Sequence, residues 1–266
     1  MNKRLKKVVV IIGGIYLLIG ALLYCFQEKM LFMPSELPED YKFVFSNEFQ
    51  ELNIKNGDKV LLNAVHFKNE NPKGVILYFH GNMGDLQRWG IHAEFFVEKE
   101  YDVLVMDYRT YGKSKGVLNE QSFYDDAQLF YNHLKKTYKE SEIIVYGRSL
   151  GTGIATYVAS KNNPKQLILE TPYYSIADVA KQRFPIYPIN LLLKYKFPSY
   201  KFIKSVQCPI SIYHGSADKV VPYTSGQKLF SEAPKLLAKL ITIDGGRHNN
   251  LVSYKTYLEE INKELN

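Results

Sequence analysis

The sequence predicts an α/β protein whose mainly parallel sheet is covered by helices on both faces. Short apolar, β-branched runs alternate with helical patterns along most of the chain, and this alternation is typical of parallel sheets. One such run, residues 143–146, leads through residues 147–151 (GRSLG) into residues 152–160, which are rich in small side chains. That stretch therefore reads as a buried strand, a sharp turn and a helix.

The expected elements follow in order from residue 49. The Asn56-Gly57 pair lies between two alternating runs and predicts an antiparallel hairpin at the start of the sheet. Buried strands are expected at residues 74–79, 103–106, 143–146, 167–169, 210–213 and 236–243. Helices are expected at residues 86–99, 123–138, 152–160 and 250–265. With 266 residues, of which 46% are hydrophobic, the chain can bury one sizeable core.

The N-terminal region predicts a membrane anchor. Residues 8–26 carry no charge, and a run of about 19 apolar residues is enough for one bilayer-spanning helix. No small-residue cleavage site follows, so we expect an uncleaved anchor. Four basic residues precede the run and place the N-terminus in the cytoplasm and the domain on the extracytoplasmic side. We divide the chain into tip and anchor (1–29), membrane-proximal linker (30–48) and globular domain (49–266).

Charge and cysteine content exclude several classes of protein. The net charge is +7, but no basic stripe with interleaved aromatic residues is present, so we expect no nucleic-acid partner. The two cysteines, Cys25 and Cys208, cannot form a disulfide within the domain, because Cys25 lies in the apolar run. No group of His, Cys, Asp and Glu has metal-ligand spacing, and we expect neither a metal nor a cofactor. The sequence leaves the oligomeric state open.

Ser149 is the candidate nucleophile, because GRSLG matches G-x-S-x-G in a strand–turn–helix context. A serine hydroxyl needs a base, and His248 lies in a glycine-rich loop after the last strand. Asp218, in the loop after strand 210–213, completes the order Ser…Asp…His. Glu170 is the rival acid, because it ends the strand before that one. We expect Asp218 to hold the histidine.

An anion forming at this serine would need hydrogen-bond donors. The backbone N–H of Leu150, the residue after the nucleophile, is the first expected donor. The second is expected from the loop after strand 74–79, where Asn82 is preferred and Met83 is the alternative. Both donors would be backbone groups, so the Asn82 side chain is not required for this role.

Residues 175–207 interrupt the alternation of strands and helices. Three prolines cut this segment into short pieces, and it is rich in Phe, Tyr and Leu. We interpret it as a small cap over the site, with an interface patch as the alternative. The cap contains a single acidic residue, Asp178, against six basic ones, Lys181, Arg183, Lys194, Lys196, Lys201 and Lys204. A cationic, aromatic cap suits acyl chains or anionic head groups.

These motifs together resemble the α/β-hydrolase superfamily, and more narrowly the Bem46-like membrane-anchored serine hydrolases. The resemblance rests on the N-terminal anchor and on LFMPSELPEDYKF, HGN, DYRTYGKS, GRSLG, LETPYYS, CPISIYHGSADKVVP and GGRHNN. It implies the α/β-hydrolase fold and a catalytic triad that falls on Ser149, Asp218 and His248. One departure is Thr110, where relatives usually carry glycine, so the conformation of that loop cannot be carried over.

The predicted function is a membrane-anchored serine hydrolase that cleaves carboxylic esters or thioesters of acyl or lipid-like substrates. A peptidase is the first alternative, because the same triad cleaves amides. An enzyme taking free N-termini should carry a carboxylate near the cap, where Asp178 stands alone. A binding module without activity is the second alternative, and the intact set of three groups argues against it. The lipid bilayer is the expected partner of the anchor.

Overall fold

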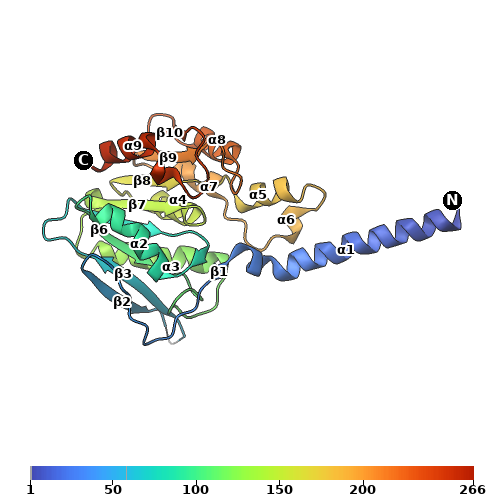
Figure 1. Ribbon diagram of the computed structural model, residues 1–266, viewed down its shortest axis with the longest axis horizontal. Helices are drawn as coiled ribbons and strands as arrows, with labels where there is room; N and C mark the ends of the chain where they lie inside the picture. The colour runs from blue at the N-terminus through green and yellow to red at the C-terminus, as the bar shows by residue number, and fades with distance from the viewer. Residues whose placement is uncertain (1, 58) are drawn as a thin grey trace.

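A computed structural model describes residues 2–57 and 59–266. Its main sheet consists of β2 (Phe49–Lys55), β3 (Leu61–Phe67), β4 (Val75–Phe79), β6 (Asp102–Met106), β7 (Ile143–Arg148), β8 (Gln166–Glu170), β9 (Ile210–Gly215) and β10 (Ala238–Ile243). The strand order is β10-β9-β8-β7-β4-β6-β3-β2 (Figure 1). β2 and β3 pair antiparallel, as do β3 and β6, and the other neighbours are parallel. The predicted mainly parallel sheet with an initial hairpin is confirmed.

Helices cover both faces of this sheet and create two apolar cores. One face carries α2 (Leu86–Val97) and α9 (Lys255–Leu265), and the other carries α3 (Glu120–Leu134), α4 (Gly151–Lys161) and α8 (Tyr223–Glu232). Neighbouring side chains of one strand point to opposite faces. In β4, Leu77 therefore joins the core under α3 and α4, whereas Ile76 and Tyr78 join the core under α2. Both layers hold the carboxyl ends of the strands in fixed positions.

Helix α8 was not predicted from the sequence. Its first turns contain Thr224, Ser225 and Gly226, which have low helix propensity. Glycine is needed at position 226 because a Cβ there would lie 2.2 Å from Nδ1 of His214. The C-terminal helix is also shorter than predicted, since a 3-10 turn (Leu251–Ser253) precedes α9. In both places tertiary packing overrides the local pattern.

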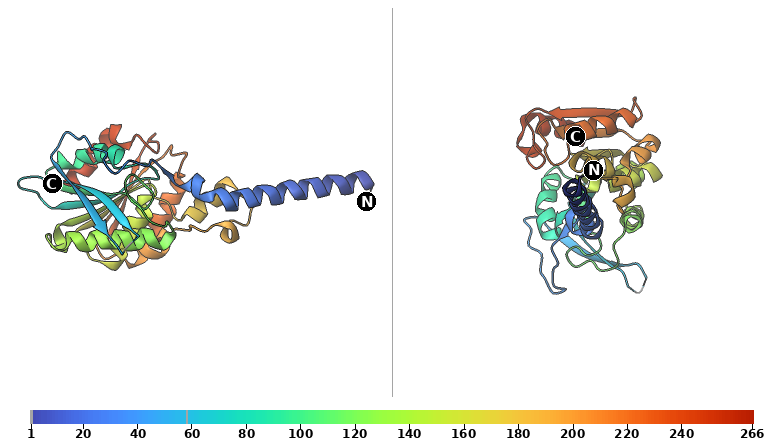
Figure 2. Two further views of the ribbon diagram at one scale, coloured as in Figure 1. Left: turned by 90° about the horizontal axis from the view of Figure 1, so that it is seen from below. Right: turned by 90° about the vertical axis from the view of Figure 1, so that its right-hand side faces the viewer.

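The N-terminal helix α1 (Lys3–Leu31) projects away from the domain (Figure 2). It is long and apolar enough to cross a membrane, with a mean hydropathy of 2.6 over its most apolar window. The helix extends past the apolar run and into the expected linker. There β1 (Met33–Pro34) pairs parallel with β5 (Met83–Gly84). β5 directly follows residues 80–82, the loop after β4, which is here called the β4 loop. Residues that follow α1 are therefore attached to the domain surface near the β4 loop.

The cap contains α5 (Ile176–Arg183), α6 (Ile189–Leu192) and α7 (Ser199–Phe202). α7 packs against α4, whereas α5 and α6 extend outward beside α1 (Figure 1). Gln27 of α1 is 4% exposed and joins the two parts: its Nε2 donates to the Leu192 carbonyl at 3.0 Å, and its Oε1 accepts from the Lys194 amide at 2.7 Å. Helix α1 and the cap thus form one packed unit.

Thr110 occupies a left-handed backbone conformation, with φ of 73°. Its amide donates to the Ser114 carbonyl at 3.1 Å, which closes the loop after β6. Glycine adopts positive φ without steric cost, whereas a β-branched residue is strained there. The loop therefore has the conformation that a glycine would favour, although the sequence carries threonine.

We expect Thr110→Gly to raise the free energy of unfolding by about 1 kcal/mol, because relief of the strained φ exceeds the added entropy of the unfolded chain. The control Thr110→Ala keeps a Cβ at positive φ and should change stability by less than about 0.5 kcal/mol. Urea denaturation measures both variants. A glycine variant that is no more stable than the alanine variant would contradict the strain argument.

Candidate active site

Ser149 lies in the turn between β7 and α4 and is strained, with φ of 50°. The turn is possible because two glycines allow close backbone contact. A Cβ at Gly151 would lie 2.0 Å from the Phe79 carbonyl oxygen, and a Cβ at Gly147 would lie 2.6 Å from the Gly151 carbonyl oxygen. The Ser149 amide donates to the Glu170 carbonyl at 2.9 Å, which ties the turn to β8. The G-x-S-x-G pattern therefore meets its steric requirement here.

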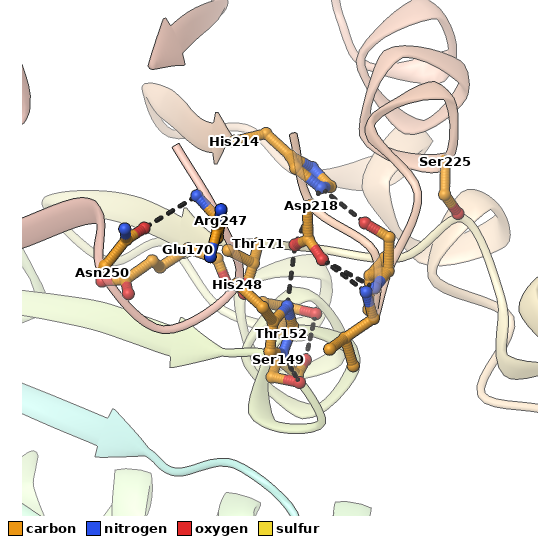
Figure 3. A network of polar contacts seen from close by, with 12 residues as sticks. Ser149, Thr152, Glu170, Thr171, His214, Asp218, Ser225, Arg247, His248 and Asn250 are labelled. Atoms are coloured by element: carbon orange, nitrogen blue, oxygen red, sulfur yellow. Dashed lines mark hydrogen bonds and ion pairs between the residues drawn. The ribbon is translucent and has the colours of Figure 1, made fainter. Parts of the chain in front are cut away.

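His248 and Asp218 lie beside this serine (Figure 3). Nε2 of His248 is 2.9 Å from Oγ of Ser149, and Nδ1 is 2.7 Å from Oδ2 of Asp218. A carboxylate accepts hydrogen bonds, so Nδ1 carries a proton and Nε2 is free to accept one from the serine hydroxyl. The three side chains come from loops after β7, β9 and β10, as parallel strands predict.

Asp218 is held by four donors. Its Oδ1 accepts from the amides of Val220 and Val221 at 2.8 and 3.0 Å. Its Oδ2 lies 3.4 Å from Nε2 of His214, in addition to the contact with His248. Burial by itself would raise the pKa of Asp218, but the hydrogen bonds from His214 and His248 outweigh it and hold that pKa well below its usual value. The carboxylate is therefore ionised at neutral pH.

His214 is a contact that the sequence did not predict. Its Nε2 lies 3.0 Å from the Val221 carbonyl oxygen. A carbonyl oxygen only accepts, so Nε2 carries the hydrogen, which can also be shared with Asp218. The signal was present in HGSAD, where His214 and Asp218 are four residues apart.

Glu170, the rival acid, faces a different group of residues. Its Oε1 lies 3.1 Å from Nε of Arg148, while its Oε2 accepts from the hydroxyls of Tyr257, at 3.0 Å, and Tyr146. All of these residues are buried. The carboxylate neutralises the arginine of GRSLG beneath the turn, and its hydrogen bonds do not involve His248.

The two expected anion donors flank Ser149. Leu150 begins the turn into α4, and the β4 loop passes close to the serine: a Cβ at Gly81 would lie 3.8 Å from the Ser149 Cβ. Within residues 2–57 and 59–266, neither the Leu150 amide nor the Asn82 amide has an acceptor. The Asn82 side chain donates to the Leu31 carbonyl at 2.9 Å, so it fastens the end of α1 to this loop.

A cavity of about 430 Å³ opens next to Ser149. Its walls are mainly apolar and come from the end of α1, the β4 loop, α5 and the His248 loop. The wall from α1 and β1, which sequence reasoning missed, consists of Met30, Leu31, Phe32 and Met33. The charged residues among its lining are Arg88, Arg148 and Arg183, and its described lining contains no carboxylate. The site thus places Ser149, in contact with His248, beside a mainly apolar pocket whose described lining includes three arginines.

A family model described as "Serine aminopeptidase, S33" matches residues 70–202, half of the chain. This segment contains the β4 loop, the Ser149 turn and most of the cap. The chain belongs to this α/β-hydrolase family. It is therefore a serine hydrolase by family, and the resemblance inferred from the sequence motifs is confirmed.

This hydrolase is similar to several known proteins. An uncharacterized protein of Acanthamoeba polyphaga mimivirus is 30% identical over 79% of this chain and 78% of its own length. Lysophosphatidylserine lipase ABHD12 of Danio rerio is 31% identical over 63% of this chain, which spans about half (48%) of that relative. An esterase of Pyrococcus furiosus superposes with a TM-score of 0.65 at 19% identity, covering 87% of this chain and 98% of the esterase, and this likeness concerns the fold alone.

We expect Asp218→Asn to lower kcat by about 10³- to 10⁴-fold, because the amide cannot hold the required His248 tautomer. Glu170→Gln should leave kcat within about tenfold but destabilise the fold by about 3 kcal/mol, since it leaves Arg148 buried without its charge partner. Hydrolysis of a p-nitrophenyl ester and thermal denaturation separate the two effects. If a folded Glu170→Gln variant has a lower kcat than Asp218→Asn, then Glu170 and not Asp218 is the acid that holds His248.

Proposed function

We propose that this hydrolase is a membrane-anchored enzyme that cleaves carboxylic esters or thioesters of acyl substrates through Ser149, His248 and Asp218. The observation that carries the proposal is the continuous chain of contacts from Asp218 through His248 to the strained Ser149. Ser149 also lies at the wall of a mainly apolar cavity, which supports an acyl substrate.

In this mechanism Ser149 Oγ attacks the substrate carbonyl while His248 Nε2 takes the hydroxyl proton. The Leu150 and Asn82 amides stabilise the oxyanion, and such a donor contributes about 3–4 kcal/mol to lowering the barrier. His248 then protonates the leaving alcohol or thiol. Water, deprotonated by the same nitrogen, releases the acid from the acyl-enzyme. Ionised Asp218 stabilises the imidazolium throughout.

The pocket favours acyl esters over peptides with a free N-terminus. An ammonium group would need a carboxylate near the scissile bond, and the described lining contains arginines instead. Asp178, the single acidic residue of the cap, points to Lys228, with 2.8 Å between Oδ1 and Nζ. Arg88 and Arg183 are exposed on the rim, and they would attract an anionic head group.

A fluorophosphonate should label the wild-type protein, and Ser149→Ala should abolish labelling, because the probe reacts only with an activated serine hydroxyl. Thr152→Ala is a matched control, since its hydroxyl lies one turn further along α4 and bonds the Ser149 carbonyl. It should keep most of the labelling. Equal labelling of Ser149→Ala and wild type would exclude Ser149 as the nucleophile.

We also propose that α1 crosses the membrane with its N-terminus in the cytoplasm and the hydrolase domain on the extracytoplasmic side. The basic residues Lys3, Arg4, Lys6 and Lys7 precede the apolar run and support this orientation. A protease added to spheroplasts should therefore digest the domain without lysis. Digestion that requires lysis would reverse the orientation while leaving the chemistry of the site unchanged.

A further inference from the structure

The outermost part of the cap is an uncharged segment that lies beside α1. This segment, residues 184–193 (FPIYPINLLL), is here called the cap tip, and Arg183 and Lys194 flank it. Ile186 and Leu191 are 71% and 83% exposed. Figures 1 and 2 show α5 and α6 extending away from the sheet on the same side as α1. Such an exposed apolar surface costs free energy in water unless something covers it.

The cap tip meets α1 in the middle of its apolar run. Tyr16 stacks on Tyr187 with ring centroids 4.7 Å apart, and its hydroxyl donates to the Ile186 carbonyl at 2.9 Å. At about 1.5 Å per residue, Tyr16 lies about 15 Å along the helix from Phe26, and a hydrocarbon core is about 30 Å thick. A cap tip packed at Tyr16 therefore lies at bilayer depth whenever the apolar run spans the membrane.

The backbone of the cap tip suits an environment without water, where unpaired polar groups are costly. Pro185 and Pro188 have no N–H to satisfy. The carbonyl of Leu192 accepts from the Gln27 side chain. Amides that donate to backbone carbonyls are those of Phe184, Tyr187, Ile189, Leu191, Leu192 and Leu193. Most backbone amides of the cap tip are therefore paired, the exceptions within residues 2–57 and 59–266 being those of Ile186 and Asn190, and its side chains carry no charge. Lipid is thus a suitable covering partner for most of this surface.

Two neighbouring apolar cavities lie between the cap tip and Ser149. A second cavity, of about 60 Å³, lies between α1 and α5–α6. It shares the wall residues Met30, Leu31, Ala180 and Phe184 with the cavity at Ser149. Its lining contains no charged residue, and Gln27 is its polar member. A passage from the region beside α1 to Ser149 would run through these shared walls.

We propose that the cap tip inserts into the lipid bilayer beside α1 and that the acyl chain of a membrane lipid reaches Ser149 sideways, through the seam between α1 and α5. This inference rests on the proposed function for its second part, because the acyl chain must end at the reacting carbonyl. Insertion itself depends only on the surface of the cap tip. The anchor helix then serves as one wall of the acyl-binding site.

Insertion is tested on the full chain in vesicles of phosphatidylcholine and phosphatidylglycerol. Burial raises the pKa of the Cys208 thiol to about 12, so that thiol is protonated and unreactive, and Cys25→Ala supplies the background. An environment-sensitive fluorophore is placed at Ile186→Cys or, as the control, at Leu236→Cys. Leu236 is fully exposed and precedes the amino end of the edge strand β10. Doxyl-labelled lipids should quench the first label and spare the second. An Ile186 label that is quenched no more than the Leu236 label, or that is shielded without lipid quenching, would overturn insertion.

The passage is tested with fluorophosphonates carrying a short or a long alkyl chain. Ala180→Trp should narrow the seam and slow labelling by the long probe about tenfold relative to the short probe, which is the loss expected when about two methylene groups stay unburied. Gln182→Trp is the matched control, because residue 182 is exposed on the same helix and lies outside both cavity walls. It should change neither rate.

The outcomes of the labelling experiment are distinct. Wild type that reacts with neither probe would refute the proposed function, and the lipid-quenching result would still decide insertion. The passage would be refuted if the wild type reacts with both probes and the Ala180→Trp variant keeps the wild-type ratio of the two rates. The proposed serine hydrolase activity would not be affected by that result.

Discussion

The geometry of the site depends on one constraint, the close backbone contact at the turn between β7 and α4. Ser149 keeps a positive φ because Gly147 and Gly151 let the start of α4 approach the backbone of β4 and β7. Any side chain at either glycine would separate these elements. The contact also brings the β4 loop to the serine, so Ser149 and the amides of Leu150 and Asn82 are placed by the same packing.

Two buried carboxylates near the turn have different surroundings and therefore different roles. Asp218 accepts only hydrogen bonds from backbone amides and two imidazoles, which keep it ionised and aligned with His248. Glu170 instead neutralises Arg148 and accepts from two tyrosines beneath the turn. Asp218 thus orients the His248 imidazole, and Glu170 supports the strand end that leads to Ser149.

The helix α1 packs against the domain as well as projecting away from it. Gln27 and Asn82 connect α1 to the cap and to the β4 loop, through the carbonyls of Leu192 and Leu31. Residues at the end of α1 therefore line the cavity beside Ser149. A displacement of α1 would therefore change the shape of the pocket beside Ser149.

The sequence by itself determined the strands of the main sheet, the helices α2, α3, α4 and α9, the hairpin, the Ser149 turn and the resemblance to α/β-hydrolases, because periodicity, glycine spacing and turn residues act locally. It did not reveal α8, whose Gly226 is explained only by contact with His214. The choice between Asp218 and Glu170 remained a preference in the sequence, and the tertiary structure shows which of them contacts His248. The α1 wall of the pocket also depends on tertiary structure, because packing between residues more than a hundred positions apart leaves no local pattern.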